Sequence, residues 1–179
     1  MPSVQDFSSL WVRPPLPPAS EERRMDADFF TFENLINHAH GAINHFPIAL
    51  LFVSVGLDLF ALLKKRPNLH RPAWLLLMLG MIGAIAATVT GLIAHLPYEE
   101  DPTLVAAIEP HQYTAFAATA VFAALTAWRW RSLRRGWDVG GSAPYLALAL
   151  LGLVVLGITG FLGGNLITEW GIGVRGITR

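Results

Sequence analysis

The sequence contains no cysteine and few charged residues. Without cysteine, disulfide bonds, thiolate catalysis and cysteine-ligated zinc or iron–sulfur centres are excluded. Charged residues make up 15% of the 179 residues, well below the roughly 25% typical of soluble domains. Hydrophobic residues make up 53%, too large an apolar content for a mostly disordered chain. The 13 basic and 13 acidic side chains balance to zero net charge, which argues against binding to nucleic acid.

Charges are almost absent from four apolar segments, at residues 46–63, 73–96, 112–128 and 143–164. A transmembrane helix needs about 20 apolar residues, with a range of roughly 17–25. These segments show almost no polar face, which a helix of a soluble protein would have. We therefore predict an all-α fold, a four-helix transmembrane bundle.

Basic residues gather in two of the predicted loops. They are Lys64, Lys65, Arg66 and Arg71 after the first segment, and Arg129, Arg131, Arg134 and Arg135 after the third. The positive-inside rule places both loops in the cytoplasm and both termini outside. We therefore expect a multi-pass protein in the lipid bilayer of a bacterial cytoplasmic (inner) membrane, with its outer side in the periplasm.

Two flanking regions and two short helices complete the predicted organisation. Residues 1–27 are expected to form a mobile, proline-containing tail, residues 28–175 the membrane domain and residues 176–179 a C-terminal tail. Asp28 is expected to cap a short helix in the outer interface. A second short helix is expected between Pro97 and Pro110, with Asp101 as its N-cap and Pro102 as its first residue.

Five of the six histidines fall at the predicted outer boundary of the membrane. They are His38, His40, His45, His95 and His111, whereas His70 is expected to be solvated in a basic loop. Steps of four residues from His95 and His111 follow small residues, along which membrane helices pack closely. The outer imidazoles are therefore expected to point into the bundle.

Inward-facing histidines on neighbouring helices are typical ligands of haem iron or of a transition metal. The candidate ligands are His40, His45, His95 and His111, for haem b or, alternatively, for copper or zinc. Asn165 and Glu169, where the last helix leaves the membrane, could hydrogen-bond to the imidazoles. Hydrogen bonding to backbone, water or lipid headgroups, with no cofactor, is the alternative role of these histidines.

Asp58 lies within a predicted span, where a carboxylate costs about 2.5–3.5 kcal/mol on insertion scales. It is either a proton-relay or ion-pathway residue, or a buried structural carboxylate. The structural interpretation is favoured, with Ser54 one turn away and an arginine of a cytoplasmic loop, such as Arg131, as bonding partners.

These features favour a membrane redox subunit similar to a b-type cytochrome. It would pass electrons between a quinone and an outer partner such as a c-type cytochrome. A copper- or zinc-binding or transport module, and a structural or assembly subunit of a larger complex, are the alternatives. The sequence shows no nucleophile–base pair, phosphate loop or carboxylate dyad, so an autonomous enzyme is not expected.

Three motifs together resemble a family of bacterial membrane proteins known as domain of unknown function 2231. They are His40-Gly-Ala-Ile-Asn-His45-Phe-Pro, then Gly91-Leu-Ile-Ala-His95-Leu-Pro with His111 after it, and the glycine-rich segment from Gly163 to Val174. The resemblance covers about residues 35–175 and implies a four-helix membrane fold without an established activity. In the family a proline typically follows the first histidine, whereas here Gly41 follows His40.

Overall fold

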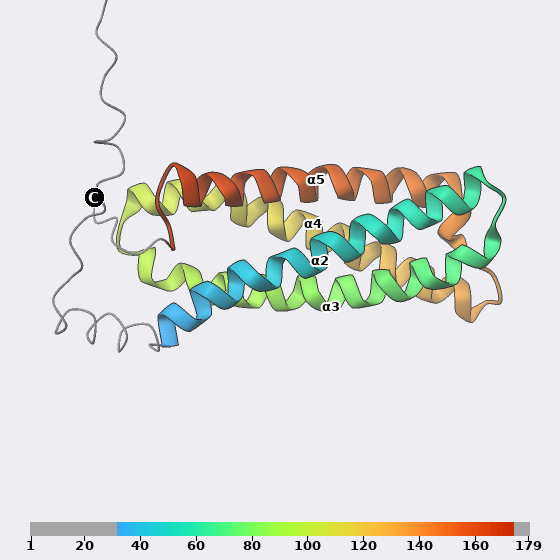
Figure 1. Ribbon diagram of the computed structural model, residues 1–179, viewed down its shortest axis with the longest axis horizontal. Helices are drawn as coiled ribbons and strands as arrows, with labels where there is room; N and C mark the ends of the chain where they lie inside the picture. The colour runs from blue at the N-terminus through green and yellow to red at the C-terminus, as the bar shows by residue number, and fades with distance from the viewer. Residues whose placement is uncertain (1–31, 174–179) are drawn as a thin grey trace, which may run out of the picture.

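The computed structural model describes residues 32–173, and this part of the chain is a bundle of four long helices without a strand (Figure 1). The helices are α2 (Phe32–Leu63), α3 (His70–His95), α4 (Pro102–Arg134) and α5 (Ala143–Thr168). Short 3-10 helices lie in the connections: η2 (Pro67–Leu69), η3 (Leu96–Tyr98) and η4 (Val139–Gly141). The predicted all-α bundle is confirmed. The tails predicted for residues 1–27 and 176–179 lie outside the described residues.

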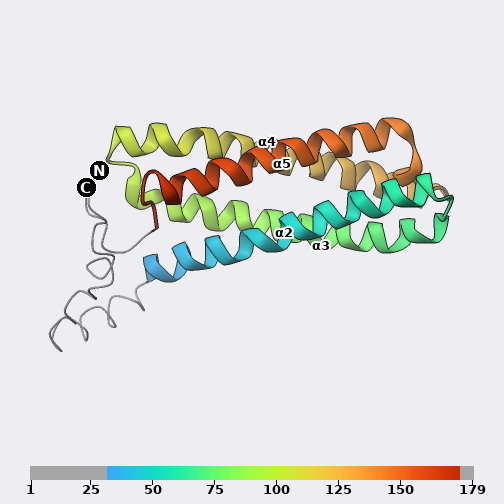
Figure 2. The same ribbon diagram turned by 45° about the horizontal axis from the view of Figure 1, so that its top comes forward.

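The bundle consists of two helical hairpins. Helix α2 packs along α3, and α4 packs along α5 (Figures 1 and 2). The described chain begins and ends at the same end of the bundle, as expected for four antiparallel neighbours. Toward that end α2 diverges from α5 in both views.

Helices α2 and α4 are longer than predicted. The first runs without a break from Phe32 to Leu63 and includes Pro47, and the second runs from Pro102 to Arg134 and includes Pro110. The prediction of two separate interfacial helices is therefore wrong. Asp28, the expected cap of the first of them, lies outside the described residues. At about 1.5 Å per residue, each helix exceeds the roughly 30 Å hydrocarbon core. The segments expected as surface helices are instead the ends of these two helices.

The predicted cap at the start of α4 is confirmed. The Asp101 carboxylate accepts hydrogen bonds from the backbone N–H groups of Thr103, at 2.8 Å, and Leu104, at 3.4 Å. Pro102 follows as the first helical residue, where its missing N–H needs no partner.

Three helices are long and apolar enough to cross a membrane: α2 from His38, the α3 segment Pro67–Tyr98, and α5. Helix α4, which contains the predicted span 112–128, does not meet the same threshold. Its sequence contains several threonines, and polar residues stand at both ends of the predicted span, so it is less apolar than the other three helices. It still runs the length of the bundle beside α5 (Figure 1).

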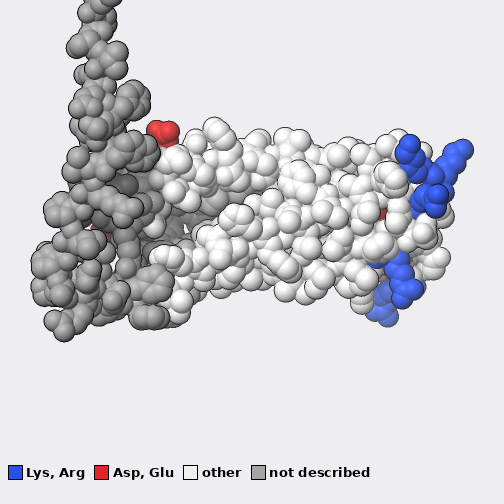
Figure 3. Space-filling model, in the orientation of Figure 1, with Lys and Arg blue, Asp and Glu red and all other residues white. Residues whose placement is uncertain are grey.

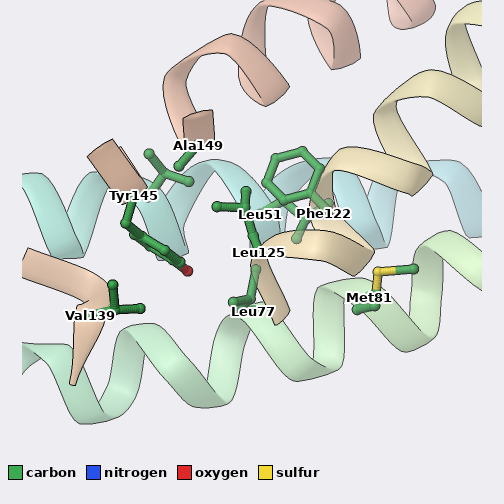
Figure 4. Close-up of a cluster of buried hydrophobic side chains, with 9 residues drawn as sticks. Leu51, Leu77, Met81, Phe122, Leu125, Val139, Tyr145 and Ala149 are labelled. Atoms are coloured by element: carbon green, nitrogen blue, oxygen red, sulfur yellow. The ribbon is translucent and has the colours of Figure 1, made fainter. Parts of the chain in front are cut away.

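The core and the surface are both apolar. Leu51, Leu77, Phe122 and Leu125 meet in the centre of the bundle and are at most 1% exposed (Figure 4). Large apolar side chains also point outward, among them Phe161, which is 69% exposed. A surface of this kind suits lipid rather than water.

The charges lie at the ends. Lys and Arg side chains gather at the end formed by the α2–α3 and α4–α5 connections, which we call the basic end (Figure 3). The opposite end is the histidine end, because it includes His40, His45, His95 and His111. Both predicted basic loops thus lie at one end of the bundle.

Candidate functional site

The histidine end contains a cavity of about 560 Å³. All four helices contribute to its wall, and most of the lining residues are glycine, alanine or other apolar residues. Five histidines line it: His38, His40 and His45 from α2, His95 from α3 and His111 from α4. The candidate ligands chosen from the sequence therefore come together around one space, although nothing in their geometry identifies what they bind.

His40 is fixed between α2 and α3. Its Nδ1 lies 3.1 Å from the carbonyl oxygen of Ala87 and 3.2 Å from Thr90 Oγ1, so the Nδ1–H donates to α3. Its Nε2 accepts a hydrogen bond from the Asn44 side chain at 3.1 Å. The ring rests on Gly91, where an added Cβ atom would lie only 2.8 Å from His40 Cε1. Glycine at this position is what allows the close approach.

His111 is fixed in the same way between α4 and α5. Its Nδ1 donates to the carbonyl oxygen of Thr159 at 3.0 Å. The ring rests on Gly163, where an added Cβ atom would lie 2.9 Å from His111 Cε1. No described residue hydrogen-bonds to its Nε2. An Nδ1–H bonded to a carbonyl is the usual support of a metal-binding imidazole, because it fixes the tautomer that leaves Nε2 available.

His45 and His95 are held less firmly. His45 Nδ1 donates to the carbonyl oxygen of Gly41 in the preceding turn at 2.9 Å, and the residue is exposed. His95 Nε2 is buried without a hydrogen-bond partner among the described residues. Asn165 and Glu169, predicted to support the imidazoles, do not line the cavity. Their supporting role stays a prediction, while His40, His45 and His111 bond to backbone carbonyls, and His40 also to Thr90 and Asn44.

A second polar cluster lies at the basic end, around Asp58. This residue is 1% exposed and forms an ion pair with Arg129, which is fully buried. Arg129 Nη1 donates to Asp58 Oδ2, and Arg129 Nη2 donates to Asp58 Oδ1 at 3.1 Å. The pair connects α2 to α4, and so joins one hairpin to the other.

Two further residues complete the cluster. Asp138 accepts from Arg129 Nε at 2.9 Å and from Nη2 at 3.0 Å. His70 donates from Nδ1 to Asp58 Oδ1 at 2.7 Å, and its carbonyl oxygen accepts from Arg129 Nη2 at 2.8 Å. Gly140 packs against the guanidinium, where a Cβ atom would lie 2.5 Å from Nη2. Each of the three nitrogens of the buried guanidinium donates to at least one acceptor.

Three details of the Asp58 prediction are wrong. The arginine is Arg129, whereas Arg131 is exposed. Ser54 is buried, but its hydroxyl donates to the carbonyl oxygen of Ala73 at 2.7 Å and not to Asp58. His70 is not solvated in a loop, because it begins α3 and its side chain is 16% exposed. Helical spacing contained the signal for Arg129: it falls on the same face as the core residues Phe122 and Leu125.

The described residues contain no group of three or more His, Cys, Asp or Glu side chains arranged to hold a metal ion. A preformed zinc site needs three or four such ligands. The histidine end therefore differs from a preformed zinc site: its imidazoles are separate from one another and surround a mostly apolar space.

Comparison with known families agrees with this architecture. Residues 38–176 match the family model described as "Predicted membrane protein (DUF2231)". No curated protein and no solved structure matches the chain. The matched region includes α2 from His38 onward, all of α3, α4 and α5, and both polar clusters. The chain belongs to the DUF2231 family of predicted membrane proteins.

Proposed function

We propose that the protein is a membrane redox subunit that binds haem b at the histidine end. One observation carries the proposal: five histidines from three helices line a single cavity with mostly small and apolar walls. Its volume of about 560 Å³ lies within the roughly 300–1,000 Å³ of cofactor clefts. Haem b needs apolar walls for its macrocycle and an imidazole Nε2 for its iron.

The chain's own part in this function is to position the iron ligands. His111 lines the cavity, and its Nδ1–H is bonded to Thr159, so its Nε2 is the nitrogen that would bind the iron. Haem would supply reversible one-electron exchange. The lining offers no charged side chain besides the histidines, so the surroundings favour a buried, low-dielectric cofactor.

The position of the cavity suggests the redox partners. By the positive-inside rule the basic end is cytoplasmic, so the cavity lies at the periplasmic side of the bacterial inner membrane. A lipophilic quinone would reach it from the bilayer, and a c-type cytochrome or oxidoreductase would reach it from outside.

The copper or zinc alternative has less support, because the described residues bring no three ligating side chains together. An assembly or structural role requires no cavity. The structural or assembly alternative does not explain why five histidines line one space.

Haem titration of the purified full chain in detergent micelles tests the proposal. We expect a saturable Soret band at one haem per chain and a pyridine-haemochrome signal of haem b. Empty micelles are the first control, because haem partitions into detergent. A variant with alanine at His40, His45, His95 and His111 is the second. Haem uptake no greater than that of either control would overturn the proposal.

A further inference from the structure

The two hairpins repeat the same contacts at an offset of 71 positions between α2 and α4 and 72 positions between α3 and α5. His111 lies 71 positions after His40, and Thr159 lies 72 positions after Ala87, so both histidine–carbonyl bonds occupy equivalent places. Gly163 likewise lies 72 positions after Gly91. Gly91 contacts the His40 ring, and Gly163 contacts the His111 ring.

The repeat extends through the core to the basic end. Phe122 lies 71 positions after Leu51, and they pack on Gly152 and Gly80, which are themselves 72 positions apart. Arg129 lies 71 positions after Asp58, and these two equivalent residues pair with each other. A pair of equivalent residues can meet only near an axis that relates the two hairpins. The bundle therefore has an approximate twofold axis along its length, between α2–α3 and α4–α5.

The same axis relates His40 to His111. Both imidazoles line the main cavity, and with His95 they also line a second space of about 60 Å³. Neither His45 nor His95 has a histidine at its equivalent position, because Phe116 and Ile167 stand there.

We propose that His40 and His111 are the axial pair of the haem iron, one from each hairpin. The proposal rests on the haem function above and deepens it. A planar haem has two opposite axial positions, which match two imidazoles related by a twofold axis. Each ring is fixed through Nδ1 to a carbonyl of the neighbouring helix of its own hairpin, which leaves Nε2 as the nitrogen able to bind iron.

One residue breaks the symmetry. Asn44 donates to His40 Nε2, whereas Ala115 stands at the equivalent position beside His111. His111 is therefore ready to bind, and His40 must first release Asn44. Asn44 therefore occupies His40 Nε2 through a hydrogen bond when no iron is bound, which we call its holding role.

The test compares single variants of the full chain in detergent, with haem affinity and spin state as readouts. In the wild type we expect a six-coordinate, low-spin spectrum. His40→Ala and His111→Ala should each change the haem to high spin or weaken binding by more than about 100-fold, beyond the roughly 10–100-fold loss of an outer support. His45→Ala and His95→Ala are matched controls that remove an imidazole at the same end, and they should remain low-spin.

Two additions separate ligation from misfolding. Free imidazole should restore the low-spin spectrum in His40→Ala and His111→Ala, which a misfolded chain would not allow. Asn44→Ala should bind haem at least as tightly as the wild type, because His40 Nε2 is then released.

The outcomes are distinguishable. Low-spin haem that survives His40→Ala or His111→Ala, or is lost in His45→Ala or His95→Ala, overturns the axial pair but leaves the haem function intact. No specific haem binding by the wild type overturns both. Weaker binding by Asn44→Ala overturns the holding role.

Discussion

The two ends of the bundle use polar side chains in opposite ways. At the basic end, Asp58, Arg129, Asp138 and His70 satisfy one another and fill the space between the hairpins. At the histidine end, imidazoles surround a cavity, and Nε2 of His95 and His111 have no hydrogen-bond partner among the described residues. A polar cluster that satisfies itself stabilises a fold, whereas imidazole nitrogens without partners beside a cavity remain able to bind a ligand.

The largest effect should come from breaking the pair at the basic end. Arg129→Met leaves Asp58 buried without its counter-charge, and we expect the free energy of unfolding to fall by about 3–5 kcal/mol. Unfolding in mixed micelles, followed by circular dichroism, measures this. Arg131→Met removes an exposed arginine from the same helix and should change stability by less than about 0.5 kcal/mol.

Replacing both partners separates a structural role of Asp58 from a proton-relay role. In Asp58→Leu with Arg129→Met the buried charges are gone, so most of the lost stability should return. Asp138, which is 25% exposed, can then be hydrated. If Asp58 is structural, this double variant keeps the haem affinity of the wild type. Restored stability with lost redox activity would instead favour a relay.

A smaller effect is expected from crowding the histidine end. In Gly163→Ala the new methyl group would lie 2.9 Å from His111 Cε1, so the ring must shift and its bond to Thr159 must lengthen. We expect a loss of about 1–3 kcal/mol in stability and a weaker haem affinity. Gly157→Ala is the matched control on α5, since nothing lies within 4 Å of its Cβ position. Equal behaviour of the two variants would contradict the close packing of His111.

The contrast between the two ends also explains what the sequence could predict. Long apolar segments predicted the bundle, and the positions of the histidines relative to those segments predicted that they lie at one end. The pairing of Asp58 with Arg129 was not predicted, because Arg129 and Arg131 both follow the third segment and only the helix face distinguishes them. The bond between Asn44 and His40 depends on side-chain torsions that no spacing determines.

Helix ends were the least predictable feature. Pro110 was expected to end a short helix, and Pro47 lies near the start of the first predicted span, but both lie inside continuous helices. A proline removes one backbone hydrogen bond and crowds the preceding turn, which usually ends or kinks a helix. Here tertiary packing opposes that tendency: Pro47 is buried against α3, where a Cβ atom on Gly83 would lie 3.2 Å from its ring.

The smallest effect should come from the cap that starts α4, outside both polar clusters. Asp101→Ala removes the acceptor of the Thr103 and Leu104 N–H groups and should cost about 1 kcal/mol, the usual value for such a cap. Glu100→Ala is the control, because it removes the same charge from the neighbouring exposed position. Haem affinity should be unchanged in both, since neither residue lines the cavity. A loss of affinity in Asp101→Ala alone would mean that the start of α4 sets the position of His111, and the site would then depend on the whole helix rather than on its contacts with α5.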